Sequence, residues 1–466
     1  MTSDPGLPGN RILVVGAARS GLAATALLLG HGYQVTLTDH RPAADLDPEI
    51  RELTEKGVCL EAGRHHAVSF READLVVVSP GVPSDLAEIR QAREAGVPVW
   101  AEVELAWRFI KGPIAGVTGS NGKTTTTSLT AHLLREARID AVACGNIGVP
   151  LSSLVSEDSA SRWYVVEMSS FQLETIDQLR PHIAVHLNLT RDHLDRHSDF
   201  SHYRNAKERI FTNQTSEDHA VLNLDDTLVA AAADRIHSQI SWFGLSPDPR
   251  PRFAVEHGSF VARSGELALR PLLPCTQYAL RGSHNISNAL ASLTAASLCG
   301  AQVSDLASGL RSFRPLPHRM EPVGVLGGIE FVNDSKATNV DAALRAVEAF
   351  DQPVVWILGG REKDSDFQPL KTIAGSDRVR GVIVMGEAAE HITEALGDVV
   401  PIRRVIDLSS ALREARDLAR SGDVVLLSPA CASFDQYRSY EERGDEFRAR
   451  VRAIMEKETD GPAPGV

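Results

Sequence analysis

Short apolar runs alternate with helical patterns along most of the chain. Runs such as residues 11–16, 163–167 and 354–359 have the pattern of buried strands. Helical patterns between such strands are typical of βαβ units with mainly parallel sheets. The sequence therefore predicts an α/β protein.

The chain has 466 residues, more than one hydrophobic core usually holds. We predict three domains: a Rossmann-like domain at 1–110, a central P-loop-type ATPase domain at 111–313, and a Rossmann-like C-terminal domain at 314–466. Short alternating segments at 253–280 predict a small antiparallel β patch in the central domain. The proline-rich stretch at 314–319 has the composition of a stiff linker.

The clearest chemical motif is a glycine-rich turn at 116–126, which follows an apolar strand pattern and precedes a helical one. Such a turn directs backbone N–H groups and the positive end of the helix dipole toward an anion. Lys123 supplies a charge for the outer phosphates of a nucleotide, and Thr124 a hydroxyl ligand for its magnesium. Val117 occupies the position of the first Walker glycine, so the loop is a variant.

A second glycine-containing turn, at 16–21, follows the first predicted strand, and Asp39 ends the next one. This is the layout of a dinucleotide-binding fold. Ala18 replaces the middle glycine that lets the backbone approach a pyrophosphate. The replacement disfavours NAD and leaves another nucleotide diphosphate, or no ligand, as the alternatives.

Other candidates rest on residue type and position. Glu167 ends a predicted strand beside the loop, where an acid can ligate magnesium. His193 and His197 have the spacing of zinc ligands on a helix, but no third ligand stands at a recognisable spacing, and His193 alone is typical of a loop histidine. Lys207, on a predicted helix, is typical of a solvated lysine. Cys431 is typical of a small buried thiol, with a nucleophile as the alternative.

Three polar stretches follow strands of the third domain, at 333–339, 359–364 and 428–437. Ligands of open α/β sheets bind beyond the carboxyl ends of the strands. The stretches contain Lys336 and Lys363, so they suit a small polyanion. The alternative is a set of ordinary polar loops with helix caps.

The composition excludes several classes of protein. A formal net charge of -13 disfavours a nucleic-acid or anionic-membrane partner. The start of the chain lacks the pattern of a secretory signal, and no apolar run approaches the ~20 residues that span a bilayer. The five cysteines are scattered, without a C-x-x-C pair. We therefore expect a cytoplasmic protein with no nucleic-acid partner and no stable membrane insertion.

A series of stretches in the chain resembles the D-glutamate-adding members of the Mur ligase family. The loop at 118–124 is similar to the Mur form of the phosphate loop, which also lacks the first Walker glycine. The further similar stretches, which occur in family order over nearly the whole chain, are 145–148, 167–173, 192–196, 282–289, 316–319, 333–339 and 427–436.

The resemblance implies an amide-forming reaction in peptidoglycan precursor synthesis. ATP would phosphorylate the L-alanyl carboxylate of UDP-N-acetylmuramoyl-L-alanine, and the amine of D-glutamate would attack the resulting acyl phosphate. The family also implies two Mg²⁺ ions and a monomeric enzyme. In such phosphoryl transfer, positioning and charge neutralisation carry the catalysis.

The resemblance further implies roles for individual residues. Lys123 would hold the outer phosphates, and Thr124 and Glu167 one magnesium. His193 would serve the second magnesium with Glu167. Lys207 matches a lysine that is carbamylated in the family, a modification that would turn a cation into an anionic metal ligand.

The resemblance also assigns residues to three ligands. Those expected around ATP are Thr118, Gly119, Ser120, Asn121, Gly122, Lys123, Thr124, Asn285, Asn288, Arg319 and Asp334. Those expected near the uridine diphosphate are Arg19, Ser20, Asp39, His40, Arg41 and Asn146. Those expected around D-glutamate are Lys336, Thr338, Lys363, Ser433, Phe434 and Tyr440.

The sequence departs from the family pattern at Ala18, where a glycine is usual, and at His40, an unusual residue for a uracil contact. Several other functions compete with this interpretation. Relatives that add diaminopimelate or lysine carry an Asp-Asn-Pro-type motif, which is absent, and folylpolyglutamate synthases lack the stretch at 428–433. The two other alternative functions are an NAD-dependent oxidoreductase and an inactive ATP-binding regulator.

Overall fold

The computed structural model describes residues 6–83, 85–191, 196–197, 199–264, 268–362 and 366–459. These residues form two compact units. The first unit comprises the chain up to residue 191 together with 196–275 and 287–312, and the second comprises 276–286 and the chain from 313 onward.

The first sheet of the first unit is parallel throughout, in the order β3-β2-β1-β4-β5. Its strands are β1 (Arg11–Val15), β2 (Gln34–Asp39), β3 (Cys59–Ala62), β4 (Leu75–Val78) and β5 (Val99–Ala101). Its helices are α1 (Arg19–Gly30), α2 (Glu49–Glu55), α3 (Ala67–Glu72), α4 (Ala87–Glu94) and α5 (Glu102–Trp107). Ile12 and Val14 pack in one hydrophobic cluster with residues of α1 and α2, while Leu13 and Val15 pack in another with residues of α3 and α4. Burial on both faces explains why β1 is apolar at nearly every position.

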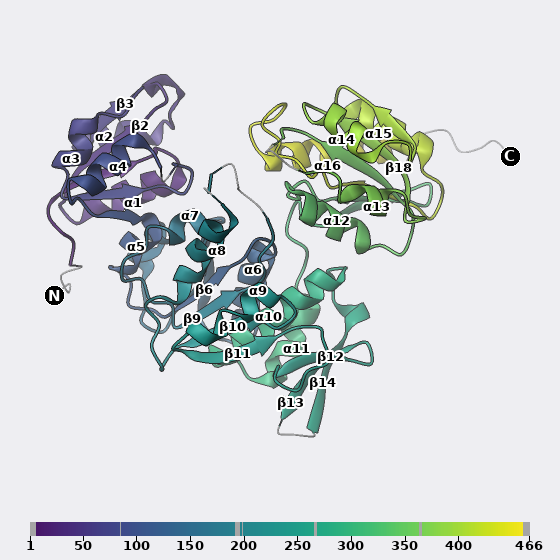
Figure 1. Ribbon diagram of the computed structural model, residues 1–466, viewed down its shortest axis with the longest axis horizontal. Coiled ribbons are helices and arrows are strands. Elements are labelled where there is room, and N and C mark those ends of the chain that lie inside the picture. Colours follow the sequence, from purple (N-terminus) through teal and green to yellow (C-terminus); the bar gives the residue numbers. More distant parts are fainter. Residues whose placement is uncertain are drawn as a thin grey trace. The chain divides into compact units, whose positions relative to one another are not determined.

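The second sheet of this unit is also parallel, in the order β11-β10-β9-β6-β8-β7. Figure 1 labels β6, β9, β10 and β11 of this sheet. Its strands are β6 (Ile114–Thr118), β7 (Ala141–Gly145), β8 (Trp163–Glu167), β9 (Ile183–His186), β10 (His219–Asn223) and β11 (Gln239–Phe243). The helices along this part are α6 (Lys123–Glu136), α7 (Ser170–Leu173), α8 (Phe200–Glu208), α9 (Thr227–Ala230), α10 (Ser283–Leu298) and α11 (Val303–Ser312). Strands β12 (Phe253–Glu256), β13 (Ser259–Ser264) and β14 (Ala268–Pro274) confirm the predicted antiparallel patch.

The sheet of the second unit has the order β15-β16-β20-β17-β18-β19, and β15 pairs antiparallel to an otherwise parallel set. The strands are β15 (Glu321–Leu326), β16 (Ile329–Asn333), β17 (Val354–Gly359), β18 (Val379–Met385), β19 (Ile402–Arg404) and β20 (Val424–Leu427). The helices are α12 (Val340–Glu348), α13 (Leu370–Ala374), α14 (Ala389–Leu396), α15 (Leu408–Leu418) and α16 (Tyr440–Thr459). The predicted α/β class is thus confirmed in all three sheets of this kind.

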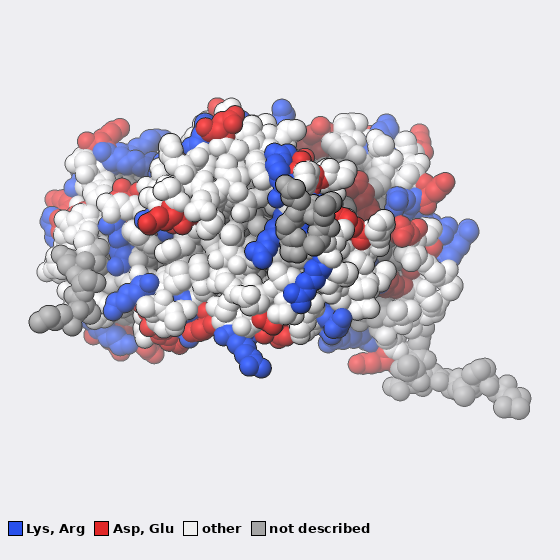
Figure 2. Space-filling view, turned by 90° about the horizontal axis from the view of Figure 1, so that it is seen from below, with Lys and Arg blue, Asp and Glu red and all other residues white. Residues whose placement is uncertain are grey.

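Figure 2 shows Lys and Arg side chains interspersed with Asp and Glu side chains over the face it presents. Among the described helices, none combines the length and the apolar character needed to cross a bilayer.

Candidate active site

The glycine-rich loop joins the end of β6 to the start of α6, as the sequence predicts. Gly122 precedes α6 with a φ of 84°, and a Cβ atom there would lie 2.3 Å from Asn288 Oδ1. Gly119 has a φ of 151°, and its Cβ would approach Leu187 Cβ to 2.9 Å. Both positions therefore require glycine. The resulting bare backbone lies at a helix N-terminus, where an anion is favoured.

Groups from α8 and from the segment that follows β9 hold the loop in shape. Asn188 Oδ1 accepts a hydrogen bond from the Asn121 N–H at 2.8 Å, and Asn188 Nδ2 donates to the Asn121 carbonyl at 3.0 Å. Ser120 Oγ lies 3.0 Å from the Tyr203 hydroxyl and donates to the Thr190 carbonyl at 3.0 Å. These bonds preorganise the loop, so little ordering is left for ligand binding.

Two lysine ammonium groups meet at one backbone oxygen of the loop. Lys123 Nζ donates to the carbonyl oxygens of Gly119 at 2.8 Å and Ser120 at 2.7 Å. Lys207 Nζ, from α8, donates to the same Gly119 oxygen at 2.8 Å and lies 4.6 Å from the centre of the Tyr203 ring. Lys207 is only 2% exposed, so the interpretation of a solvated lysine is wrong. Two like charges at one oxygen make this point strongly positive, which favours an anion there.

Glu167 ends β8, between Val117 of β6 and Gly145 of β7 in the sheet register. Its buried carboxylate accepts a hydrogen bond from the Thr124 hydroxyl at 2.7 Å and one from Asn146 Nδ2 at 3.0 Å. Mg²⁺ prefers oxygen ligands at about 2.1 Å in an octahedron, which places adjacent oxygens ~3 Å apart. The Thr124 and Glu167 oxygens therefore fit two neighbouring ligand positions of a magnesium ion.

Arg19 connects the N-terminal turn with this region. It is the first residue of α1, and its Nη1 donates to the Gly148 carbonyl at 3.4 Å. Gly148 lies two residues beyond Asn146, which donates to Glu167. Ser20 follows Arg19 on the same helix and is partly exposed. Of the residues expected near the uridine diphosphate, Asn146 thus contacts Glu167, and Arg19 contacts the same segment two residues further on.

The Asp39 carboxylate is bound by groups of the protein itself. It accepts hydrogen bonds from the Ala17 N–H at 2.7 Å, from the Arg41 N–H at 2.9 Å, and from the Arg41 guanidinium at 2.9 and 3.0 Å. Burial acts to raise the pKa of Asp39, but these bonds outweigh it and hold the pKa well below its ordinary value. His40, beside it, is largely exposed. An acid so fully engaged is poorly placed to bind ribose hydroxyls, which further disfavours NAD.

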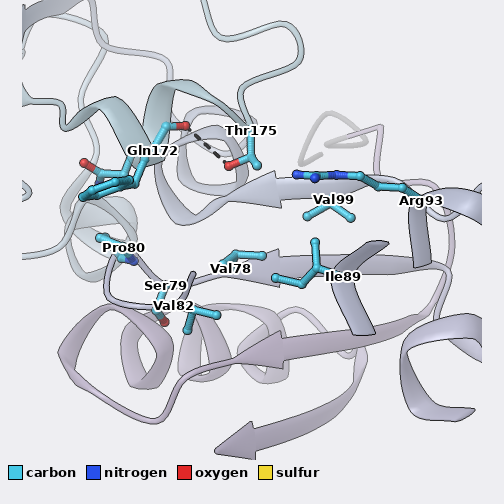
Figure 3. Close-up of a pocket in the computed structure, with 10 residues that line it drawn as sticks. Val78, Ser79, Pro80, Val82, Ile89, Arg93, Val99, Gln172 and Thr175 are labelled. Atoms are coloured by element: carbon cyan, nitrogen blue, oxygen red, sulfur yellow. Dashed lines mark hydrogen bonds between the residues drawn. The ribbon is translucent and has the colours of Figure 1, made fainter. Parts of the chain in front are cut away.

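A segment after Glu167 packs on the first sheet. Figure 3 shows Gln172 and Thr175 facing Val78 and Val99 across a narrow crevice. The Thr175 hydroxyl donates to the Gln172 carbonyl at 3.5 Å. The chain that follows Glu167 therefore lies against the edge of the first sheet at β4 and β5.

In the second unit, the three polar stretches lie at the carboxyl ends of β16, β20 and β17, as the sequence predicts. The sheet order makes these strands neighbours. Asp334 is buried and accepts hydrogen bonds from the Met320 N–H at 3.1 Å and the Ser428 hydroxyl at 3.0 Å. Burial raises the pKa of Asp334 to about 7, since these bonds and the charge of Arg319 offset only part of the desolvation.

The side chain of Arg443, which is only 1% exposed, binds to two of these polar stretches. Its guanidinium donates to the Ser335 hydroxyl at 2.9 Å, to the Ser335 carbonyl at 2.9 Å and to the Cys431 carbonyl at 3.2 Å. The neighbouring Lys336 places its ammonium 3.7 Å from the centre of the Tyr440 ring. Two residues expected around D-glutamate are thus in contact. Cys431 is buried in the core, as expected for a structural thiol.

The remaining predicted residues differ in their burial and in their hydrogen bonds. Ser433 is buried, and Phe434, after it, is 58% exposed. The Thr338 N–H donates to the Lys336 carbonyl at 2.8 Å. Asn285, one turn before Asn288 on α10, donates to the Arg281 carbonyl at 2.7 Å. His193 and Lys363 lie outside the described residues.

The chain is similar to known proteins along most of its length. It matches the Mur ligase MurD-like N-terminal domain over residues 10–101, the Mur ligase middle domain over 117–296, and the Mur ligase glutamate ligase domain over 318–431. The UDP-N-acetylmuramoylalanine--D-glutamate ligase of Acidobacterium capsulatum is 47% identical over 96% of this chain and 97% of its own length. The protein of the same name from Koribacter versatilis is 42% identical over 97% of this chain and 99% of its own length.

The chain belongs to the Mur ligase family. Solved structures agree with this fold. A pseudomurein peptide ligase type C from Methanothermus fervidus superposes with a TM-score of 0.61 at 16% identity, over 96% of this chain and 100% of its own. The MurF ligase of Thermotoga maritima in complex with ADP has a TM-score of 0.61 at 17% identity, over 91% of this chain and 96% of its own.

In this Mur ligase, the sequence does not reveal several residues that contact the site from positions far away in the chain. Asn188 and Tyr203 hold the loop although they are 67 residues from Asn121 and 83 from Ser120. Arg443 reaches Ser335 across 108 residues. The one available signal is that Asn188 closes the mostly apolar run at 183–188, which has the pattern of a strand, because strands that neighbour the loop end at the same edge of the sheet.

His186, at the end of β9, is a buried histidine whose two ring nitrogens lack a hydrogen-bond partner among the residues that the structure describes. Burial, with the positive charges of Lys207 and Arg204, lowers the pKa of His186 from 6.5 to about 3. Below pH 6.5 the unfolded chain therefore binds a proton here that the native state does not. Protonation of His186 in the unfolded chain therefore costs no stability above pH 6.5 and an increasing amount as the pH falls toward 3.

We expect His186→Leu to stabilise this Mur ligase by about 1–3 kcal/mol, because an unpaired buried polar group is replaced by an apolar one of similar volume. The stabilisation should grow between pH 6.5 and pH 4, as measured by urea unfolding at several pH values. His182→Leu is the matched control, since His182 Nδ1 accepts the Ile114 N–H at 3.3 Å. Equal effects of the two substitutions would contradict the explanation.

Proposed function

We propose that this chain is an ATP-dependent ligase that joins D-glutamate to UDP-N-acetylmuramoyl-L-alanine in peptidoglycan precursor synthesis. The observation that carries the proposal is the arrangement at the loop, where Lys123 and Lys207 share the Gly119 oxygen and Thr124 pairs with Glu167. This is a site for a nucleotide polyphosphate and its metal. The choice of amino acid and carboxylate substrate is supported by relatives that are named UDP-N-acetylmuramoylalanine--D-glutamate ligase. Their similarity covers 96–97% of this chain.

The first step activates the carboxylate. A carboxylate oxygen of the L-alanyl group attacks the γ-phosphorus of ATP, the bond between that phosphorus and the β,γ-bridging oxygen breaks, and ADP leaves. The acyl phosphate that forms keeps the transferred phosphoryl group. We assign Lys123 to neutralise charge on the outer phosphates, and Asn121, Gly122 and Asn288 to contact the nucleotide around them.

The second step forms the amide. The amine of D-glutamate attacks the acyl carbon, inorganic phosphate leaves, and the nitrogen loses a proton. We assign Lys336, Thr338, Lys363, Ser433, Phe434 and Tyr440 to the binding of D-glutamate. The cationic Lys336, held against Tyr440, suits a substrate with two carboxylates.

Magnesium, when bound, would offset the charge of the phosphates. Thr124 and Glu167 fit one ion by their oxygen donors and spacing. We assign a second ion to Glu167, His193 and a carbamylated Lys207. Carbamylation joins the neutral Lys207 amine to carbon dioxide and releases one proton. It would replace the second of two adjacent cations by an anion, and so relieve their repulsion.

The proposal also covers the binding of the two nucleotides and the location of the enzyme. The N-terminal domain, through Arg19, Ser20, Asp39, His40, Arg41 and Asn146, would bind the uridine diphosphate of the substrate. ATP would contact Asn285, Arg319 and Asp334 as well as the loop. The enzyme would act in the cytoplasm as a monomer, with no nucleic-acid partner.

The proposal is tested by the release of phosphate from ATP with UDP-N-acetylmuramoyl-L-alanine and one amino acid at a time. D-Glutamate is expected to support release, while L-glutamate, D-aspartate, L-lysine and diaminopimelate are not. A preparation that lacks the UDP substrate is the control for uncoupled hydrolysis. Release with L-glutamate but not with D-glutamate would refute the assignment.

A further inference from the structure

Two histidines and one glutamate form a cluster separate from the residues assigned above. Glu174 follows α7, His197 precedes α8, and His202 lies in the first turn of α8. Glu174 Oε1 is 3.0 Å from His197 Nδ1 and 3.7 Å from His202 Nδ1, and the two nitrogens are 3.4 Å apart. Three potential ligand atoms from three segments therefore surround one point.

This triangle has the size of one face of a zinc coordination tetrahedron. Zinc binds imidazole nitrogen and carboxylate oxygen at about 2.0–2.2 Å, which sets neighbouring tetrahedral ligands about 3.3–3.5 Å apart. The observed separations of 3.0, 3.4 and 3.7 Å bracket that distance. A hydrogen bond between Glu174 and His197 accounts for the shortest separation. The 3.4 Å between the two imidazole nitrogens is long for a hydrogen bond and matches the spacing of two zinc ligands.

The donor set selects the kind of metal. Two imidazoles and one carboxylate suit a transition metal such as zinc, whereas magnesium and calcium prefer all-oxygen sites. In the sequence, no third zinc ligand stands at a recognisable spacing from His193 and His197. The structure supplies two partners for His197: Glu174, which is 23 residues earlier in the chain, and His202, in the first turn of α8.

The surroundings of His197 hold its ring in place. Its side chain is fully buried, and its second nitrogen, Nε2, lies 2.9 Å from the Ser170 hydroxyl. Such an outer hydrogen bond orients a metal-binding imidazole. The ring also stacks on Phe171, with centroids 5.1 Å apart and an interplanar angle of 8°.

His202 is placed by the cap of its helix. Its backbone N–H donates to the Asp199 carboxylate at 2.8 Å, which fixes the first turn of α8. Its side chain is 51% exposed, whereas that of Glu174 is 10% exposed. The cluster is thus closed by protein on the His197 side and open to solvent at His202, so that an ion and a water ligand have access.

We propose that Glu174, His197 and His202 form a zinc-binding site with water as the fourth ligand. The site would tie α7, which begins three residues after Glu167, to α8, which carries Lys207. Bound zinc would therefore stabilise the packing of the two segments that flank the proposed magnesium site.

The test is a zinc titration of the full-length, chelator-treated protein against a chromophoric competitor, with excess Mg²⁺ to fill oxygen-rich sites. We expect one zinc ion per chain and a rise in Tm. His202→Ala should weaken zinc binding by more than about 100-fold, and Ser170→Ala by about 10–100-fold. His237→Ala, a substitution of an exposed histidine outside the cluster, should leave the affinity unchanged.

Cobalt(II) provides a second signature, because tetrahedral coordination by the wild type should give visible absorption that His202→Ala lacks. The Tm of each variant without metal shows that it is folded. Equal zinc affinity in the wild type and His202→Ala, or no zinc bound by the wild type, would overturn the proposal. Since the measurement is metal binding and not ligation, its failure is distinguishable from failure of the proposed function.

Discussion

Lys123→Ala is expected to lower kcat for phosphate release by about 10³-fold, because it removes a positioned charge from the site of phosphoryl transfer. Lys123 also donates to the carbonyl oxygens of Gly119 and Ser120, so its loss withdraws two bonds from the loop. Steady-state kinetics with saturating D-glutamate measure the effect.

The matched control for this prediction is Lys56→Ala, which removes a lysine whose side chain is 64% exposed. The control should retain the wild-type rate and Tm. The Tm of Lys123→Ala should stay above the assay temperature, so that the lost rate does not reflect unfolded enzyme. A Lys123→Ala enzyme with near wild-type kcat would show that the loop does not hold the reacting phosphates.

Lys207→Ala is expected to lower kcat by about 10²–10³-fold, with partial recovery in acetate or another short carboxylate. The truncated side chain leaves space in a buried site, and a small anion can take the place of the proposed carbamate. The same carboxylates should not restore Lys123→Ala, which lacks a cation. ¹³C NMR of the wild type in ¹³C-bicarbonate should show a carbamate that is absent from Lys207→Ala.

A Lys207→Ala enzyme that no carboxylate restores, together with a wild type that shows no carbamate signal, would refute the modification. The buried ammonium would then act as a cation next to Lys123. In that case Lys207→Arg should keep much of the activity, because it preserves the charge.

The sequence predicted the features that depend on local pattern and on the rules of parallel sheets. Glu167 was placed beside the loop because neighbouring parallel strands end at one edge, and its bond with Thr124 agrees with that placement. The polar ends of β16, β17 and β20 were grouped for the same reason. Family membership, first inferred from motifs, was confirmed by similarity over the full chain.

The remaining features depend on packing between distant segments. Lys207 was indistinguishable from a solvated lysine, because residue type carries no information about what covers a helix face. Arg443 and Tyr203 contact their partners across more than 80 residues, with no periodic signal that links them. The grouping of Glu174 with His197 and His202 likewise requires the fold to bring α7 against α8.

The central claim is that the γ-phosphoryl group of ATP passes to the carboxylate of the UDP substrate before the amide forms. The most direct measurement uses UDP-N-acetylmuramoyl-L-alanine with ¹⁸O in the L-alanyl carboxylate. We predict that the phosphate released in the presence of D-glutamate carries one labelled oxygen, as detected by mass spectrometry. Release of unlabelled phosphate together with the amide product would contradict the account.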